Sequence, residues 1–171
     1  LVLSRAYQLS ADASAANMAV DPDNRLIWRH SPRRLQAEAI RDAMLAIAGT
    51  LDRSRPKGSP ASDLKVTELA NNGELAKRIL ERANANKHRS VYLPLVRGLT
   101  PLSLEVFDFA EQGMVTGSRD TTTVASQALY LLNDPFVRQQ SRALAERGLA
   151  KKGSDDDAAG LVYRLALGRQ P

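Results

Sequence analysis

The segment that most constrains the fold is RRLQAEAIRDAMLAIAGTLD, residues 33–52. Ser31 and Pro32 precede it, and a Ser at the N-cap followed by a Pro at the first helical position predicts a helix that runs to about Leu51. The first half of the segment is charged, whereas residues 43–48 are apolar on every side. Because a helix that is apolar all round needs cover from several directions, we expect this one to be the central helix of the fold.

Two stripes compete to be the buried face of this helix. The apolar stripe consists of Ile40, Met44, Ile47 and Leu51, and its spacing fits a helical period. The charged stripe consists of Arg34, Glu38, Arg41 and, beside them, Asp42. Its arginines and Glu38 lie within about 60° of one another around the helix axis. The charged stripe continues into Leu45, which indicates that another element covers part of it.

The charged stripe has a chemical and a structural interpretation. Glu38 or Asp42 could act as an acid or base, because a carboxylate beside apolar surface can have a raised pKa. The balanced charges and the absence of a nearby nucleophile favour a structural ion network instead, since neighbouring arginines hold carboxylates ionised. Such a network needs partners from the covering element. Asp108 and Arg119, in the predicted loops over residues 104–123, are the best candidates.

Capping residues predict the remaining helices. The apolar spacing of residues 1–14 indicates the end of a helix, and Asn72 is a candidate cap for a helix over 71–87. Residues 123–133 also have a helical pattern. Asp134 and Pro135 then predict a helix that continues to Arg147 and stops at Gly148, and Ser154 is the cap of a last helix that ends at Gly168.

Strands are scarce in this pattern. Residues 90–96 have strand character confined to an edge by Pro94, and residues 104–109 could form a strand or a loop. Residues 53–62 have the composition of a surface loop. The prediction is therefore a mainly α fold: a compact multi-helix domain with long loops and at most one or two short strands. We expect the helical domain to span 1–150, with 151–171 as a linker and the start of a truncated C-terminal helix.

Residues 21–32, DPDNRLIWRHSP, carry turn signals at both ends. Between these signals Leu26, Ile27 and Trp28 are consecutive, and Trp28 is the only Trp of the chain. Large apolar side chains in this order predict that the segment is buried against something.

Composition excludes several kinds of site. The chain has no Cys, so disulfides, thiolate catalysis, zinc–thiolate sites and c-type haem attachment are excluded within these residues. His30 and His88 each lack a second ligand at helical spacing, which disfavours a metal site. The net charge of +5 is spread along the chain without a basic run, so nucleic-acid binding is not indicated. No segment has the length of about 18 apolar residues that a membrane span needs.

The motifs in combination resemble a known family. DPDNRLIWRHSPRRLQAEAIRDAMLAIAGTLD, SVYLPLVRG, FDF, SRDTTTVASQALYLLNDPFV and LAERG occur in that order. This order resembles the planctomycete PSD1 domain, also called DUF1553, over roughly residues 1–169. The chain departs from the family pattern at RPKGSP, where a Gly-Gly-Pro turn is common, and at residues 124–126, where a Pro is common.

The resemblance implies a context rather than a reaction. Proteins with PSD1 domains typically also carry PSCyt1, a cytochrome c-like domain with its own CxxCH motif, and PSCyt2, and they often have export signals. The resemblance therefore implies an extracytoplasmic accessory or interaction module. Its partners would be neighbouring domains of the same polypeptide, and haem c would be held elsewhere in that polypeptide. The resemblance supplies no catalytic residues.

Two functions stay open at this point. The first is the non-catalytic module just described, without a cofactor of its own. The second is a carbohydrate-related enzyme or ligand-binding domain with a polar site between the 33–52 helix and the 104–123 loops. Its candidate residues are Arg34, Glu38, Arg41, Asp42, Asp108 and Arg119.

Overall fold

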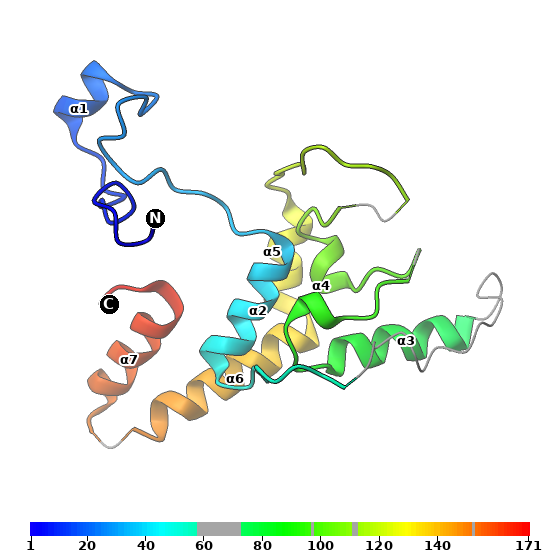
Figure 1. Ribbon diagram of the computed structural model, residues 1–171. Coiled ribbons are helices and arrows are strands. Elements are labelled where there is room, and N and C mark those ends of the chain that lie inside the picture. Colours follow the sequence, from blue (N-terminus) through cyan, green and yellow to red (C-terminus); the bar gives the residue numbers. More distant parts are fainter. Residues whose placement is uncertain (58–72, 97, 111–112, 152) are drawn as a thin grey trace. The chain divides into compact units, whose positions relative to one another are not determined.

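The computed structural model describes residues 1–57, 73–96, 98–110, 113–151 and 153–171. Within these residues it contains seven α-helices, one 3-10 turn and two isolated β-bridges, and the described residues form no sheet (Figure 1). The expected mainly α fold class is confirmed. The predicted cap Asn72 and the second half of the predicted loop 53–62 lie outside the described residues.

The chain divides into two compact units, Leu1–Arg34 and Leu35–Pro171. In the first unit a single helix, α1 (Ala15–Val20), begins at Ser14, whose side chain accepts a hydrogen bond from the amide of Asn17. The prediction of a helix over 1–14 is wrong, because residues 1–8 form successive turns and their apolar side chains are exposed. The proposed boundary between 150 and 151 stays a prediction.

Asp21 and Asn24 organise the loop that follows α1. The Asp21 carboxylate accepts hydrogen bonds from the amides of Arg25 and Leu26, at 3.0 and 2.8 Å. The Asn24 side chain accepts from the amide of Trp28 at 3.0 Å. Its amide group also donates to the hydroxyl of Ser31 at 2.7 Å.

This use of Ser31 corrects the predicted start of the central helix. The Ser31 hydroxyl serves the loop through Asn24 and caps no helix, and helix α2 (Ala37–Ala48) begins six residues later. Its N-cap is Gln36, whose side chain makes no capping hydrogen bond. Arg34 therefore precedes the helix, so only Glu38, Arg41 and Asp42 of the predicted charged stripe lie on α2.

The buried face of α2 is the charged stripe and not the apolar one. Its buried residues are Ala37, Arg41, Leu45 and Ala48. Ile40, Met44, Ile47 and Leu51, the apolar stripe, are all only half-buried. The expectation that another element covers part of the charged stripe agrees with the burial of Arg41 and Leu45. The small alanine side chains on the buried face allow neighbouring elements to pack closely against α2. Arg41 donates its hydrogen bonds on the same face.

The described elements between α2 and α5 are one long helix and two short helical turns. Helix α3 (Gly73–Ala85) is followed by a 3-10 turn, η2 (Ser90–Tyr92), and by α4 (Leu102–Glu105). The strand character predicted for 90–96 is wrong, because the first of these residues form η2 and only an isolated bridge joins Val96 to Leu99. Of the two alternatives for 104–109, the strand is not formed: residues 104 and 105 end α4, and residues 106–108 form turns. Pro94 and Pro101 suit short turns better than ladders, since proline has no amide hydrogen to donate.

The core of the second unit gathers side chains from these elements. Its buried members are Ala37, Ala83, Leu93, Leu104, Phe107 and Tyr130. The rings of Phe107 and Tyr130 meet edge to face, with centroids 5.7 Å apart. Helix α2 contacts α6, α4 and η2, so it is central to this unit as its sequence predicted.

The last three helices begin and end close to their predicted residues. They are α5 (Ala125–Asn133), α6 (Pro135–Leu149) and α7 (Asp155–Leu167). Asp134 caps α6 by accepting from the amide of Phe136, and Ser154 caps α7 in a reciprocal pair with Asp157. The cap predictions at Asp134 and Ser154 are confirmed. Gly148, predicted as the stop of α6, lies inside its last turn and is buried.

The burial of Gly148 gives a testable prediction. A Cβ atom there would lie 2.8 Å from a methyl carbon of Val162 on α7, too close for the stiff valine side chain to accommodate. We expect Gly148→Ala to lower the free energy of unfolding by about 1 to 3 kcal/mol, as overpacked sites do. Chemical denaturation followed by circular dichroism measures this difference.

Gly160, in α7, provides the matched control. The nearest side-chain atom to a Cβ at Gly160 would be 3.8 Å away, so the methyl group fits. Gly160→Ala should therefore raise the stability by roughly 0.5 to 1 kcal/mol, the ordinary effect of alanine in a helix interior. Equal effects at the two glycines would contradict the packing of α7 on α6.

Candidate functional site

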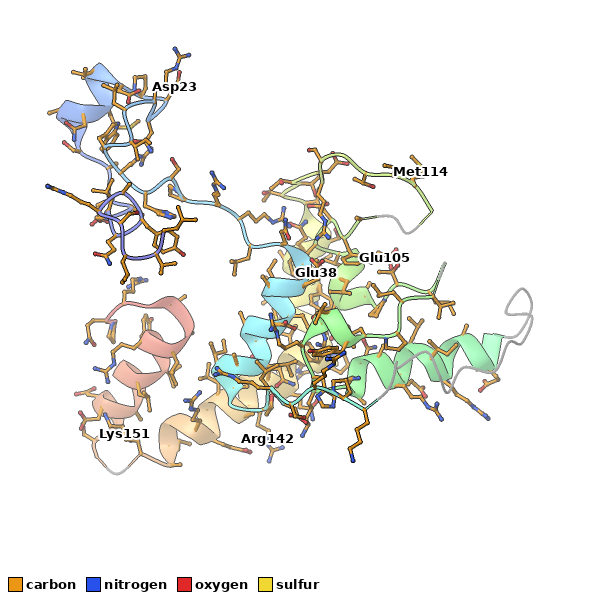
Figure 2. All side chains as sticks on the ribbon, in the orientation of Figure 1. Asp23, Glu38, Glu105, Met114, Arg142 and Lys151 are labelled. Carbon is orange, nitrogen blue, oxygen red and sulfur yellow. The ribbon has the colours of Figure 1, made fainter. Side chains whose placement is uncertain are left out.

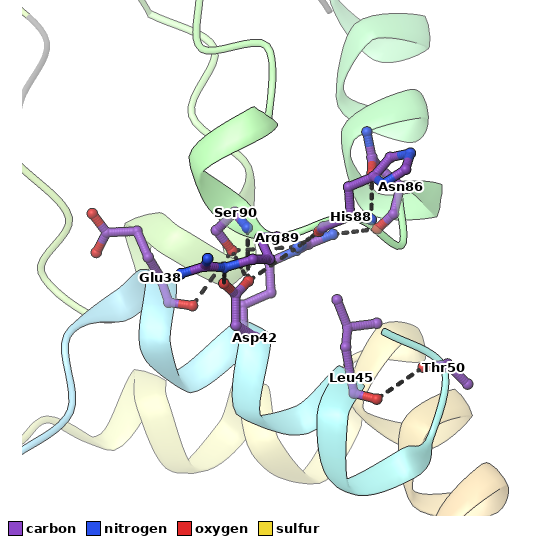
Figure 3. Close-up of polar contacts among 9 residues, drawn as sticks. Glu38, Asp42, Leu45, Thr50, Asn86, His88, Arg89 and Ser90 are labelled. Carbon is purple, nitrogen blue, oxygen red and sulfur yellow. Dashed lines mark hydrogen bonds and ion pairs between the residues drawn. The ribbon is translucent and has the colours of Figure 1, made fainter. Parts of the chain in front are cut away.

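Arg41 is the buried centre of the charged stripe. Arg41 is only 1% exposed. Its guanidinium donates hydrogen bonds to the backbone carbonyls of Asn86 and His88, and the bond to His88 is 3.1 Å long (Figure 3). Asn86 and His88 directly follow the C-terminus of α3, where carbonyl groups lack helical partners. Arg41 thus ties α2 to the end of α3 and places a positive charge at the negative end of that helix dipole.

Asp42 completes this contact through Ser90. One carboxylate oxygen of Asp42 accepts from the amide of Ser90 at 2.7 Å and from its hydroxyl at 2.6 Å (Figure 3). The same oxygen lies 3.7 Å from the guanidinium of Arg41. Ser90 is itself buried and is within 3.3 Å of Arg41. We call Arg41, Asp42, Asn86, His88 and Ser90 the α2 clasp.

The electrostatics of the clasp favour a structural role. Burial lowers the pKa of Arg41 from its ordinary value, and the charge of Asp42 opposes that shift. Arg41 also lies over the ring of Phe136 on α6, with 5.6 Å between the guanidinium carbon and the ring centroid. In the α2 clasp, the charge of Arg41 is therefore balanced by the carboxylate of Asp42. One oxygen of that carboxylate already accepts two hydrogen bonds from Ser90.

Glu38 and Arg119 form a second polar contact on α2. The guanidinium of Arg119 donates to Glu38 at 2.7 Å, and the side chains of Arg119 and Glu38 are 32% and 28% exposed. Burial would raise the pKa of Glu38, but the hydrogen bond from Arg119 and its charge outweigh burial and lower that pKa. The hydrogen bond to Glu38 in turn raises the pKa of Arg119. A carboxylate held ionised in this way is a poor general acid.

Asp108 holds the start of the segment that leads into α5. Its carboxylate accepts from both the amide and the hydroxyl of Thr122, each at 2.8 Å. The backbone of Asp108 has a φ of 60°, a left-handed conformation that aspartate tolerates better than most residues. Gln127 of α5 donates to the carbonyl of Thr122, so Asp108 and Gln127 fix this turn from both sides.

A cavity of about 280 Å³ lies beside the pair formed by Glu38 and Arg119. Its lining residues are Asp108, Phe109, Ala110, Met114, Thr116, Ser118, Arg119 and Asp120. Arg119 stacks on the ring of Phe109, with 5.3 Å between the guanidinium carbon and the ring centroid. The cavity therefore combines one aromatic ring with carboxylates, hydroxyls and a fixed cation. Its volume is at the lower end of small-molecule sites.

The structure divides the predicted polar cluster into separate places. Arg41 and Asp42 belong to the α2 clasp, while Asp108 and Arg119 line the cavity and Glu38 pairs with Arg119. Arg34 is the last residue of the first unit. Sequence reasoning missed Asn86, His88 and Ser90 as partners of α2. One signal was available, because a buried arginine needs acceptors and the residues after a helix end offer free carbonyls.

Other kinds of site find no support in the part of the chain that the structure describes. Among the described residues, His, Asp and Glu side chains form no group of three or more that could hold a metal ion. No described helix is both long enough and apolar enough to cross a membrane.

Comparison with known proteins decides the family. The family model described as "PSD1: Protein of unknown function (DUF1553)" matches residues 1–171, the whole chain. The chain belongs to the PSD1 family. Neither the curated proteins nor the solved structures contain a match to this chain. PSD1 is a family of unknown function, so the roles of residues in this PSD1 chain follow from its own geometry.

The pair of Glu38 and Arg119 predicts a pH dependence of stability. The pKa of Glu38 in the folded protein is lowered from its ordinary value of 4.5. The pair therefore stabilises the fold fully above pH 4.5, and this contribution disappears as the pH falls through the lowered pKa. At pH 7 we expect Glu38→Gln to lose about 0.5 to 1 kcal/mol, the range of partly exposed ion pairs.

Urea denaturation of the parent chain and Glu38→Gln between pH 3 and 7 measures this effect. The two unfolding free energies should converge at the acidic end of the range. The control is Glu146→Gln, which removes an exposed pair with Arg142 within α6 and should change little at any pH. A constant difference between the parent and Glu38→Gln across the pH range would contradict the pairing.

Proposed function

We propose that this PSD1 chain is an accessory or interaction module of a larger, exported, cytochrome c-containing planctomycete protein. The observation that carries the proposal is the use of the charged stripe inside the fold. Arg41 and Asp42 bind backbone groups of residues 86–90, and Glu38 is held ionised by Arg119. The most conspicuous polar residues of the sequence thus stabilise a scaffold, which suits a module that works through its neighbours.

The context of the module comes from the family resemblance. In this proposal haem c is bound by another domain of the same polypeptide, and this chain contributes no cofactor site. The partners are neighbouring domains, and the location is extracytoplasmic, at the periplasmic side or the cell surface.

The proposal is tested on the complete polypeptide that contains this chain. We expect an export signal and a CxxCH motif in its sequence and the absorption bands of c-type haem in the purified protein. After limited proteolysis between domains, this chain should co-elute with another domain in gel filtration. A polypeptide without CxxCH, or a chain that always elutes alone after cleavage, would overturn the proposal.

A second candidate function is ligand binding or catalysis at the cavity beside Glu38 and Arg119, with a carbohydrate as the ligand. The observation that favours it is the lining of the cavity, where the Phe109 ring lies near the carboxylate of Asp120 and the hydroxyls of Thr116 and Ser118. Aromatic rings pack on apolar faces of small molecules, and convergent polar groups fix their orientation.

A thermal-shift assay with neutral oligosaccharides at millimolar concentration tests this second candidate. A ligand that binds only the folded state raises the melting temperature. The increase should be lost in Asp120→Asn, an exposed residue of the lining, and kept in Asp156→Asn, an exposed residue of α7. Absence of any increase in the parent chain, or an equal increase in both variants, would count against a carbohydrate site in this cavity.

A further inference from the structure

The loop after α1 exposes two apolar side chains that the sequence predicts to be buried. Leu26 is 76% exposed and Ile27 is 59% exposed, whereas Trp28 beside them is half-buried. We call residues 24–28 the Leu–Ile loop. Asp23, labelled in Figure 2, directly precedes it. Single exposed apolar residues are ordinary, whereas Leu26 and Ile27 are adjacent and both exposed.

The shape of the Leu–Ile loop is fixed by side chains at its base. Asp21 accepts hydrogen bonds from the backbone amides of Arg25 and Leu26. Asn24 accepts hydrogen bonds from the backbone amides of Trp28 and Arg29. The indole of Trp28 donates to the carbonyl of Asp21 at 2.9 Å. Asp21 itself is buried. The two exposed side chains are therefore presented from a preorganised base.

Ile27 adopts a strained backbone conformation in this loop. Its φ is 53°, in the left-handed region that β-branched residues rarely occupy. Such strain persists only where the surrounding contacts impose it, and it concentrates at binding and functional positions. A folded partner with a shaped pocket gains affinity from a preorganised side-chain pair. A fluid lipid surface adapts to any shape and gives no such gain.

The charge around the loop indicates the character of the partner's surface. Arg25, Arg29 and Arg33 lie in this part of the sequence, and residues 24–33 contain no acidic residue. Arg25 is exposed, and its contact with the exposed Asp23 is a long one of 3.7 Å. Complementarity therefore favours a pocket whose rim carries carboxylates.

We infer that the Leu–Ile loop is a docking element, and that Leu26 and Ile27 insert into an apolar, acid-rimmed pocket on a neighbouring domain of the same polypeptide. This inference rests on the proposed function, because it names the contact through which the module meets its neighbours. It adds to that function a definite surface, a definite pair of anchor residues and the chemistry of the pocket.

The lack of cysteine in this chain allows a direct test. Leu26→Cys places a single thiol in the loop, and its modification by a maleimide is followed by mass spectrometry of the labelled peptide. The rate is compared between the 171-residue chain and the complete polypeptide. We expect modification to be at least about tenfold slower in the complete polypeptide, corresponding to a contact closed for most of the time.

Two further variants make the test specific to docking. Leu132 lies on the exposed side of α5 and is 73% exposed. The thiol of Leu132→Cys is therefore the matched control for general changes in the rate of maleimide modification. Ile27→Gly removes an anchor side chain at a backbone conformation that glycine adopts without strain. Added to Leu26→Cys, it should leave the fold of the chain intact and restore fast modification in the complete polypeptide.

Each other outcome has a distinct meaning. If the domains associate but the Leu26→Cys thiol is not protected, the inference fails and the proposed function stands. If neither association nor protection is found, both fail. Slow modification already in the 171-residue chain would overturn the inference, because the loop would then be covered from within. Protection that requires added vesicles of phosphatidylcholine and phosphatidylglycerol would overturn it in favour of a lipid surface.

Discussion

Replacing Arg41 by methionine should lower the free energy of unfolding by about 3 to 5 kcal/mol, the cost of breaking a buried charge pair by removing one partner. Methionine fills a similar volume, so a cavity contributes little to this loss. The carbonyls of Asn86 and His88 would lose their donor, and Asp42 would keep a partly buried charge without its cation. Urea denaturation monitored by circular dichroism at pH 7 measures the difference.

Arg89 provides the control for Arg41. Its side chain is 61% exposed and lies 3.9 Å from the second carboxylate oxygen of Asp42, so it is a surface ion pair with the same acid. Arg89→Met should therefore cost less than about 1 kcal/mol. Arg41→Lys should recover only part of the loss, because an ammonium lacks the planar fork that reaches several acceptors. If Arg41→Met and Arg89→Met had equal effects, the α2 clasp would not be what holds α2 to residues 86–90.

Replacing Leu104 by alanine should cost about 2 to 5 kcal/mol, the range for truncation of a fully buried leucine. Leu104 has 0% exposure and lies in the short helix α4, among the core side chains of the second unit. The loss combines the apolar area that is no longer buried with the cavity left between α2, α4 and α5. Thermal and chemical denaturation both report it.

Leu102, in the same helix, is the matched control for Leu104. It is 47% exposed, so Leu102→Ala changes the same residue type in the same short helix with little burial at stake. We expect an effect within about 0.5 kcal/mol, as for other surface substitutions. Similar effects at both positions would contradict the placement of α4, since a strand over residues 104–109 would expose a different set of side chains.

Capping signals in the sequence located helix ends well where the cap is local. Ser154 and Asp134 each bind an amide two or three residues away, so the geometry depends on neighbours that the sequence already displays. Ser31 has the same residue type and is followed by Pro32, yet it caps no helix because Asn24 takes its hydroxyl. Competition from a side chain seven residues earlier is not visible in the pattern of a helix start.

The candidate site shows the same division between local and distant contacts. The sequence identified Glu38, Arg41 and Asp42 as one charged face of a helix that another element covers, and Arg41 is indeed buried. It did not identify the covering element of Arg41, because Asn86 and Ser90 are 45 and 49 residues away. Any helix end offers similar carbonyl groups, so residue types alone do not select this one.

The sequence by itself determined the family, the mainly α class and the approximate position of most helices. These depend on motif order, helix propensity and capping, which act over a few residues. Only the tertiary structure decided that α2 buries its charged face and leaves Ile40 and Met44 half-buried. The physical reason is that burial of a charge depends on acceptors supplied by distant segments, and their positions follow from the packing of the whole unit.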